Sequence, residues 1–256
     1  MNYVPNGYWD SRLKKEFNLK GAGFKAMSEA YNKVLYEIKM KLLEETLRKH
    51  RIQIQGKKVI DVGCGTGAFL NFYIKRGGIY TGIDISKYAI TELSNTYPNI
   101  PLYKIDITRR EDVMKLLVYG KYDLVHCFDV LYHIIDDVKW RDAIANLCLL
   151  LKDEGHILFT EKMPKHDMSI KPHCKYRSRV TYNMVLAEHD LEIKEDIPLF
   201  FFLNRGTRLD YINRGIDRSR YILRFLDEVL RKTHFCENWA NLRLLVTKRA
   251  GETFET

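Results

Sequence analysis

The stretch VIDVGCGTGAFLNFYIKRGGIYTGID, residues 59–84, decides the fold of this chain. It opens on a largely β-branched run, residues 59–62, which favours a strand. Glycines alternate with small residues over Gly63–Gly67, where glycine lets the backbone turn sharply and approach a ligand. A helix over about 68–76 and a second strand over 79–83 complete the pattern. Strand, glycine loop, helix and strand in this order predict a nucleotide-binding α/β unit.

Two acidic residues indicate which cofactor suits the loop. Asp84 ends the second strand, where a carboxylate can accept both hydrogen bonds of a ribose diol. Asp61 ends the first strand, and its charge would repel the pyrophosphate of a dinucleotide but suits a cationic ligand. The spacing also differs, because the loop has G-x-G-x-G in place of the dinucleotide fingerprint G-x-G-x-x-G. These residues favour a cationic cofactor that carries adenosine; a loop that only turns the chain is the structural alternative.

This part of the chain closely resembles the first motif, D-x-G-x-G-x-G, of the class I S-adenosylmethionine-dependent methyltransferases. The resemblance implies that S-adenosyl-L-methionine is the cofactor and that S-adenosyl-L-homocysteine is the product. It also implies a set of cofactor-binding residues on the loop and at the ends of strands: Asp61, Gly63, Cys64, Gly65, Gly67, Asp84, Ile85, Asp106, Ile107, Phe128 and Asp129.

Within that set the resemblance implies separate roles for individual residues. Asp61 and the glycine loop border the methionine part and the sulfonium of the cofactor. Asp84 takes the ribose, Ile85 packs on the adenine, and Asp106 faces the adenine amino group. Phe128 and Asp129, after the fourth predicted strand, border the methionine end.

From Lys58 onward the predicted strands and helices alternate, which is typical of a doubly wound α/β sheet. The resemblance implies a Rossmann-like, seven-stranded and mostly parallel sheet whose last strand inserts antiparallel between its neighbours. Beyond residue 84 we predict strands over 101–105, 122–127, 155–160, 191–197 and 241–247, and helices over 138–151 and 181–188.

Four segments are expected along the chain. Residues 1–55 form an N-terminal helical flap, and residues 56–202 form the core that binds the cofactor. Residues 203–238 form a helical insertion that caps the substrate, and residues 239–256 hold the last strand and a tail. A long amphipathic helix is predicted over 28–49, with an apolar face that packs on the sheet or, as the alternative, on a second copy.

The carboxyl end of the fourth predicted strand is the place to search for a catalytic group, because it lies beside the methyl group of the cofactor. His133 stands there and is our candidate base, with capping a helix or lining a pocket as the alternative roles. Tyr132 is a candidate substrate contact in the same stretch. Relatives that use a metal carry E-x-x-E-H at this point, whereas this chain has D-x-x-Y-H from Asp129. The second acid is missing, so we predict no metal.

The opening of the chain resembles the Y-W-D-x-R start of many small-molecule methyltransferases. By this resemblance Tyr8 and Trp9 close the pocket and Arg12 holds a carboxylate. A surface helix with an aromatic anchor is the alternative. Further along, His173 and the basic residues of 175–179 could meet an anionic acceptor or could be solvated.

The composition of the chain limits which cellular compartment and which classes of partner we expect. The net charge of +9 is dispersed, with no run of five like charges, so it fits a solvated basic surface or an anionic small substrate as well as a nucleic acid. No apolar run is long enough to span a bilayer, the opening lacks the apolar core of a signal peptide, and we expect no membrane partner. Five scattered cysteines, among them Cys127 in a predicted strand and Cys236, indicate reduced thiols in a cytoplasmic protein without structural zinc.

The leading prediction is an enzyme that methylates an oxygen or nitrogen atom of a small-molecule acceptor, such as a polar metabolite, a sugar or a natural-product intermediate. An RNA-modifying methyltransferase is the first alternative, favoured by the charge. The N/D-P-P-Y/F motif that binds a base amine is missing after the fourth strand, which counts against a nucleobase. A protein that binds the cofactor without turnover is the second alternative, and the oligomeric state stays open.

Overall fold

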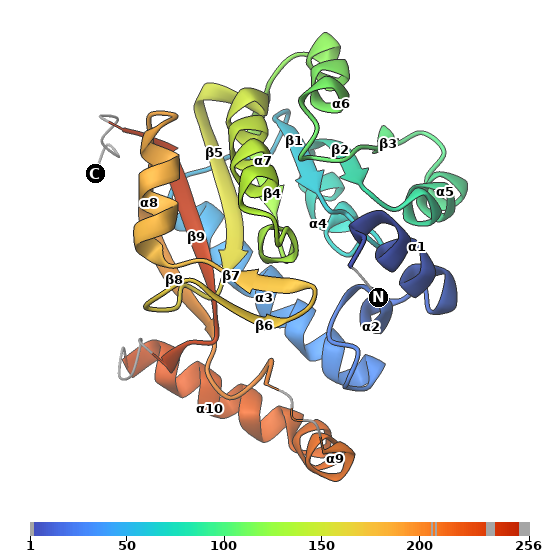
Figure 1. Cartoon of the computed structure of the whole chain (residues 1–256), viewed down its shortest axis with the longest axis vertical. Coiled ribbons are helices and arrows are strands. Elements are labelled where there is room, and N and C mark those ends of the chain that lie inside the picture. Colours follow the sequence, from blue (N-terminus) through green and yellow to red (C-terminus); the bar gives the residue numbers. More distant parts are fainter. Residues whose placement is uncertain (1–2, 206, 208, 234–238, 251–256) are drawn as a thin grey trace.

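The structure is a computed structural model that describes residues 3–205, 207, 209–233 and 239–250. Cys236, Arg208 and the predicted tail over 251–256 lie outside the described residues. The centre of the molecule is a seven-stranded sheet in the order β3-β2-β1-β4-β5-β9-β8 (Figure 1). Its strands are β1 (Lys58–Val62), β2 (Ile79–Asp84), β3 (Leu102–Lys104), β4 (Tyr122–Cys127), β5 (Leu151–Glu161), β8 (Leu191–Phe200) and β9 (Leu242–Arg249).

The pairing of the strands confirms the predicted Rossmann-like topology. β3, β2, β1, β4 and β5 are parallel to one another, and β9 is antiparallel to both β5 and β8. The strand order reverses at β1, which has β2 on one side and β4 on the other. In a doubly wound sheet such a reversal opens a crevice at the carboxyl ends of the strands, where ligands bind.

Helices cover both faces of the sheet, as a parallel sheet requires. α3 and α4 lie on one face, and α7 and α8 lie on the other (Figure 1). The helical elements are α1 (Pro5–Lys15), α2 (Leu19–Ala22), α3 (Glu29–Lys49), α4 (Leu70–Ile74), α5 (Lys87–Thr96), α6 (Arg110–Met114), η1 (Lys115–Tyr119), η2 (Leu131–His133), α7 (Asp137–Leu150), α8 (Arg179–Ala187), α9 (Asp210–Arg218) and α10 (Arg220–Thr233).

Successive residues of the central strands supply the two cores in turn, because side chains alternate across a sheet. Val59 joins the core under α3 and α4, whereas Ile60 joins the core under α7 and α8. On β5, Leu158 likewise joins the core under α3 and α4, and Phe159 joins the core under α7 and α8. Cys127 is fully buried in the second core, where it serves as a packing residue.

The long helix predicted before the core is α3. Ser28 caps it, with its hydroxyl accepting a hydrogen bond from the Tyr31 amide at 3.1 Å. The apolar face predicted for this helix is buried against strands of the sheet, so packing on the sheet is confirmed: Val34, Leu35, Ile38, Leu42, Leu43 and Leu47.

Two details differ from the sequence prediction. The helix expected over 68–76 is shorter, because regular helix runs only over Leu70–Ile74 and the residues on either side form turns. A two-stranded hairpin, β6 (Met168–Lys171) with β7 (Cys174–Tyr176), was not predicted. The two strands hold only four and three residues, MSIK and CKY, which is too short a run for alternation to single them out as strands.

The segment after β8 is helical, as predicted. Its helices α9 and α10 lie along the lower edge of the molecule in Figure 1, where α10 packs against α3 and β8. In the part of the chain that the structure describes, no helix combines the length and the apolar character needed to cross a membrane.

Candidate active site

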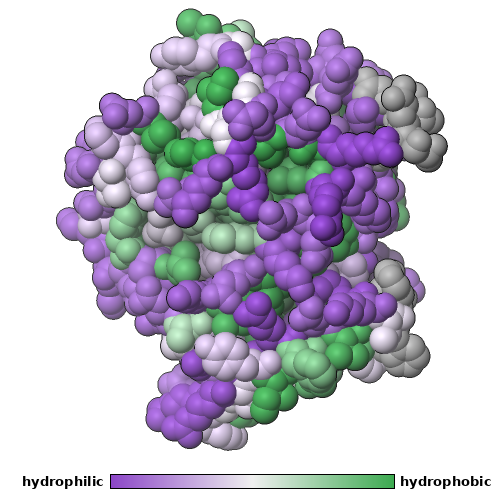
Figure 2. Space-filling model, turned by 180° about the vertical axis from the view of Figure 1, so that it is seen from behind, coloured by the Kyte–Doolittle hydropathy of each residue, from purple (hydrophilic) through white to green (hydrophobic). Residues whose placement is uncertain are grey.

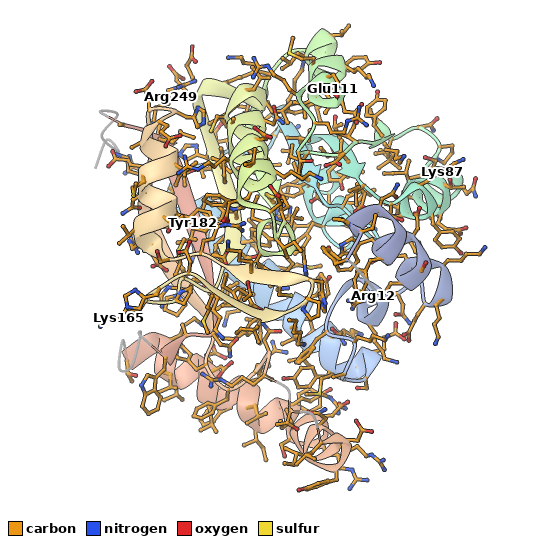
Figure 3. All side chains as sticks on the ribbon, in the orientation of Figure 1. Arg12, Lys87, Glu111, Lys165, Tyr182 and Arg249 are labelled. Atoms are coloured by element: carbon orange, nitrogen blue, oxygen red, sulfur yellow. The ribbon has the colours of Figure 1, made fainter. Side chains whose placement is uncertain are left out.

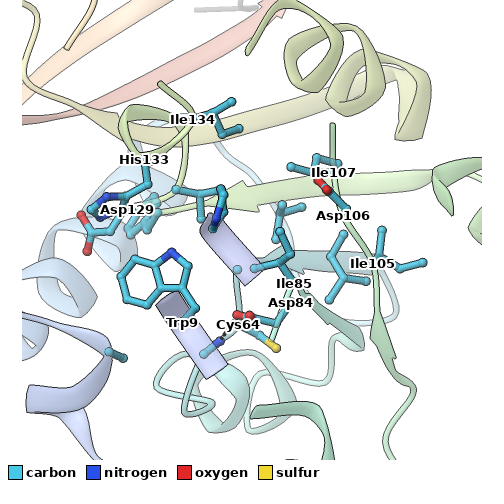
Figure 4. Close-up of a pocket in the computed structure, with 18 of the residues that line it drawn as sticks. Trp9, Cys64, Asp84, Ile85, Ile105, Asp106, Ile107, Asp129, His133 and Ile134 are labelled. Carbon is cyan, nitrogen blue, oxygen red and sulfur yellow. Dashed lines mark hydrogen bonds between the residues drawn. The ribbon is translucent and has the colours of Figure 1, made fainter. Parts of the chain in front are cut away.

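A cavity of about 430 Å³ lies at the carboxyl ends of β1, β2 and β4, where the strand order reverses. Figure 4 shows its lining, with Trp9 between Asp129 and His133 on one side and Cys64 and Asp84 on the other. Ten of the eleven predicted cofactor-binding residues line it: Asp61, Gly63, Cys64, Gly65, Asp84, Ile85, Asp106, Ile107, Phe128 and Asp129.

The glycine loop needs glycine for two different reasons. Gly63 has φ +77°, and a Cβ there would lie 2.2 Å from Cγ2 of Val130, so a side chain is excluded both by the backbone and by space. Gly67 does not line the cavity. Its φ is +75°, and a Cβ there would lie 2.8 Å from Cδ2 of Leu93 on α5. Gly67 therefore serves the packing of α5 against the loop.

Asp84 is held rigidly by the loop that it faces. Its Oδ2 accepts a hydrogen bond from the Gly65 amide at 2.9 Å, and its Oδ1 accepts one from the Ser86 amide at 2.8 Å. Burial raises the pKa of Asp84 to about 6, and these two backbone hydrogen bonds only partly offset that effect. Each carboxylate oxygen can accept more than one hydrogen bond, so this fixed group can still receive two hydroxyls.

Asp61 is buried at the end of β1 and has partners on both neighbouring strands. Tyr80 of β2 donates its hydroxyl to Oδ2 at 2.8 Å, and Nδ1 of His126 on β4 lies 2.9 Å from Oδ1. Sequence reasoning missed both partners. The signal was a histidine near the carboxyl end of a buried strand, directly opposite Asp61 in the parallel register.

Asp129 and Lys39 form a largely buried ion pair at the edge of the cavity. Burial raises the pKa of Asp129, but the charge of Lys39 and the hydrogen bonds to the carboxylate outweigh it, so that the pKa is lowered. Asp129 has φ +59°, and its amide donates to Oγ1 of Thr160 at 2.8 Å. Lys39 was missed because an isolated lysine on an amphipathic helix gives no sign that it will be buried.

His133 lies at the cavity with one ring nitrogen already engaged. Nδ1 lies 2.8 Å from the carbonyl oxygen of His173, which can only accept, so Nδ1 carries the proton. Burial lowers the pKa of His133 to about 4, so the ring is neutral at pH 7. Nε2 then has a free lone pair and can accept a proton.

The hairpin and α1 build the wall around His133. The ring of His173 stacks on that of Tyr8 with centroids 5.1 Å apart, and Tyr8 packs edge-on against Trp9 at 5.2 Å. Trp9 in turn packs against His133 at 5.0 Å. Trp9 lines the cavity, whereas Tyr8 stands behind it.

The guanidinium of Arg12 binds backbone carbonyl oxygens and does not face the cavity. It donates to the carbonyl oxygens of Gly23 and, at 3.2 Å, of Lys20, and so ties α1 to α2 (Figure 3). It does not line the cavity. The structure therefore supports a positioning role for this guanidinium rather than the predicted contact with a substrate carboxylate.

Asp10 ties α1 to the N-terminus of α5. Its Oδ1 accepts hydrogen bonds from the Ser86 hydroxyl at 2.6 Å and from the Tyr88 amide at 3.0 Å. Leu13 of the same helix and Ala22 of α2 line the cavity. The N-terminal helices thus form its outer wall.

Other predicted contacts lie outside the cavity. The Tyr132 hydroxyl donates to Oδ1 of Asp129 at 3.0 Å and so supports that carboxylate. Solvation was the wrong alternative for Arg177, which is fully buried and bonded to Asp137 and to the Ile134 carbonyl. None of the described residues of 203–238 lines the cavity, and a substrate cap in this segment stays a prediction.

One group of described side chains has the composition of a metal site. Ligand atoms of His133, His173 and Cys174 all lie within 4.8 Å of one another. Nδ1 of His133 is protonated toward the His173 carbonyl, and burial raises the pKa of the Cys174 thiol to about 11. Two of the three groups would have to lose a proton or reorient before they could bind a metal.

The chain is similar to known methyltransferases. It matches the family model described as "Methyltransferase domain" over residues 31–195. It is 32% identical over 107 residues to a ubiquinone biosynthesis O-methyltransferase of Vibrio campbellii, covering 41% of this chain and 43% of the relative. It is also 32% identical over 139 residues to a probable mRNA-capping enzyme of Acanthamoeba polyphaga mimivirus, covering 41% of this chain and 12% of that protein. The chain thus spans less than half the length of either relative.

A solved structure reproduces the fold over nearly the whole chain. Magnesium protoporphyrin IX methyltransferase from Synechocystis PCC 6803, crystallised with bound SAM, superposes with a TM-score of 0.57 at 16% identity. The superposition covers 96% of this chain and 95% of that one. At this identity the likeness shows the shared architecture.

Proposed function

Because the chain belongs to the class I S-adenosylmethionine-dependent methyltransferases, we propose that it moves the methyl group to an oxygen or nitrogen atom of a small-molecule acceptor. One observation carries this proposal. Asp84, oriented by the glycine loop, and His133, with a free Nε2, line the same cavity, so that a ribose site and a proton acceptor share one enclosure.

We assign the cofactor to the inner part of this cavity. Asp84 would receive the ribose hydroxyls, Ile85 would pack on the adenine, and Asp106 with Ile107 would meet its edge. Asp129, neutralised in part by Lys39, would meet the amino group of the methionine part. The cofactor supplies an activated methyl group, so the protein mainly has to align the acceptor with it.

We assign the acceptor to the part beside Trp9 and His133. The side chains there are mostly aromatic or aliphatic, with Tyr3, Val4 and Ile134 among the lining residues. Such walls favour an acceptor with a flat or apolar body and one hydroxyl or amine. The neutral His133 would take the proton that this group loses as it is methylated.

An RNA acceptor is the second candidate. It is favoured by the net charge of +9 and by the similarity to a probable mRNA-capping enzyme. Against it, the helix α1 closes the outer side of the cavity, which suits a small acceptor better than a polymer. A gel shift with RNA that disappears as salt is raised, together with methylation of that RNA, would favour this candidate.

The first test is calorimetric titration with S-adenosylmethionine and, separately, with NAD. We expect binding of the first alone. Asp84→Ala should weaken it by at least about tenfold, since hydrogen bonds to a charged group are lost. The matched control is Asp153→Ala, an exposed acid outside the cavity, which should bind like the wild type. An acceptor screen that measures release of S-adenosylhomocysteine then tests turnover; binding of NAD in place of S-adenosylmethionine would overturn the proposal.

A further inference from the structure

The helix α10 exposes its apolar side chains. Tyr221, Ile222 and Phe225 are 61%, 65% and 65% exposed, and Leu226 and Val229 are 38% and 40% exposed. Their spacing puts all five on one side of the helix. We call these five residues the α10 apolar face. From behind the molecule, hydrophobic surface is seen as a green band along its lower edge, where α9 and α10 lie (Figure 2).

Three charged residues of the same helix, Asp227, Arg231 and Arg224, bind neighbouring elements and hold it in place. Asp227 is fully buried and accepts hydrogen bonds from the amides of Phe202 at 2.7 Å and Leu203 at 3.2 Å. Arg231 donates to the Leu199 carbonyl at 2.7 Å. Arg224 pairs with Glu37 of α3 at 2.7 Å. These contacts fix the rotation of α10, so its apolar face is turned outward by the fold itself.

Exposed apolar residues also stand on the segments that flank α10. Tyr211 of α9 is 70% exposed, Leu209 before it is 49% exposed, and Trp239 beyond α10 is 63% exposed. Tyrosine and tryptophan have an apolar body and a polar tip, which suits the boundary between lipid and water. An exposed apolar surface of this kind marks an interaction site.

Cations accompany this surface. Arg214 and Arg218 are exposed on α9, and Lys232, with its side chain 75% exposed and 3.6 Å from the Glu228 carboxylate, follows the α10 apolar face. The chain as a whole carries +9. Two copies that met through this surface would bring like charges together, whereas an anionic surface would be attracted.

We propose that α9 and α10 dock on a membrane surface that carries anionic lipids, with α10 lying in the plane of the interface. An in-plane helix needs one apolar face and nearby cations rather than a spanning apolar run. The expectation of no membrane partner rested on the missing span, which does not bear on this mode of binding. The proposal is independent of the acceptor, because none of these residues lines the cavity.

Co-sedimentation with vesicles tests this docking. The full chain is mixed with neutral phosphatidylcholine vesicles, or with vesicles that also hold about 30% phosphatidylglycerol. We expect association with the anionic vesicles only, and less of it at high salt. The double variant Ile222→Gln/Phe225→Gln should lose at least about tenfold in vesicle affinity, and Arg214→Glu/Arg218→Glu should lose several-fold.

Val118→Gln is the matched control, because Val118 is 84% exposed on η1, away from α10, and this variant should bind vesicles like the wild type. Binding of S-adenosylmethionine should be unchanged in every variant, which shows that each has folded. Two results would overturn the proposal. One is no association of the wild type with anionic vesicles. The other is a wild-type dimer in sedimentation equilibrium that Phe225→Gln dissociates, which would assign the surface to a second copy.

Discussion

Nδ1 of His126 and Oδ1 of Asp61 lie 2.9 Å apart at the floor of the cavity, and neither side chain is more than 2% exposed. The pair joins the ends of β1 and β4, the two strands that flank the reversal of strand order. The acid of the glycine-loop motif is therefore part of the sheet core as well as part of the cavity wall.

Removal of one member of this pair should lower the stability of the fold. We predict that Asp61→Ala lowers the free energy of unfolding by about 3 kcal/mol, because it leaves His126 buried without its partner. Asp61→Asn keeps an oxygen acceptor and should lose less. Urea denaturation of the two variants measures the difference. Equal losses would mean that hydrogen bonding to His126 contributes little.

Asp84 should make stability depend on pH. Burial raises the pKa of Asp84 to about 6 from 3.8, so the folded chain holds this proton over a range in which the unfolded chain has released it. The contribution to stability is therefore present at low pH and is lost as the pH rises through 6. We predict that, without cofactor, the wild type loses about 2 kcal/mol relative to Asp84→Asn between pH 4.5 and 7. Urea midpoints at both pH values check this, and a constant difference would contradict the raised pKa.

His133 should affect turnover and not cofactor affinity. We predict that His133→Gln lowers kcat for the acceptor by about 10²-fold or more and leaves the Kd for S-adenosylmethionine within about twofold. Because burial lowers the pKa of His133 to about 4, the proton-accepting form is present throughout pH 5.5–7.5. The wild-type rate should accordingly show no rise near pH 6.5 from this residue. A pH profile of kcat, with calorimetry on the variant, separates a base from a residue that only shapes the wall.

Gly63 should resist substitution because of one neighbour. Gly63→Ala is expected to destabilise the fold by about 3 kcal/mol, since φ is +77° and the new methyl would meet Val130. Made in a Val130→Ala background, the same change should cost only about 1 kcal/mol, which is the backbone part alone. Gly7→Ala is the control, with nothing within 4 Å of the added Cβ. Additive effects at Gly63 and Val130 would show that the clash is relieved elsewhere.

Metal removal should leave the enzyme intact. We predict that dialysis against a chelator changes neither the thermal midpoint nor turnover, because His133 and Cys174 hold protons where a metal would need lone pairs. Elemental analysis of the untreated protein should find less than about one zinc ion per ten chains. Stoichiometric zinc would instead make the group of His133, His173 and Cys174 a metal centre.

The central βαβ unit could be predicted from the sequence because its signals are local. The glycines, Asp61 and Asp84 occur within 59–84, and the pattern of strand, loop and helix orders them without distant contacts. The alternation of the remaining strands and helices was readable for the same reason. The antiparallel position of β9 followed from the family resemblance rather than from periodicity.

The rest of the site depends on contacts between distant positions. His126 meets Asp61 across 65 positions, and Lys39 meets Asp129 across 90. The strands of the hairpin that brings His173 to His133 are too short to be recognised from periodicity. For α10 the sequence shows an amphipathic helix, but only the inward hydrogen bonds of Asp227 determine which side faces out.

The hydrogen bonds that Asp10 accepts from Ser86 and Tyr88 hold α1 in place, and this has a kinetic consequence. With α1 as an outer wall of the cavity, we expect a molecule the size of the cofactor to leave when this helix lifts. Such lifting breaks the contacts of one short helix, two part-buried hydrogen bonds of Asp10 among them, and should cost less than global unfolding. Cofactor residence time should therefore follow the opening frequency of the N-terminal helix rather than the strength of the ribose contacts. Release of S-adenosylhomocysteine and binding of the next S-adenosylmethionine would then both depend on the same opening of α1.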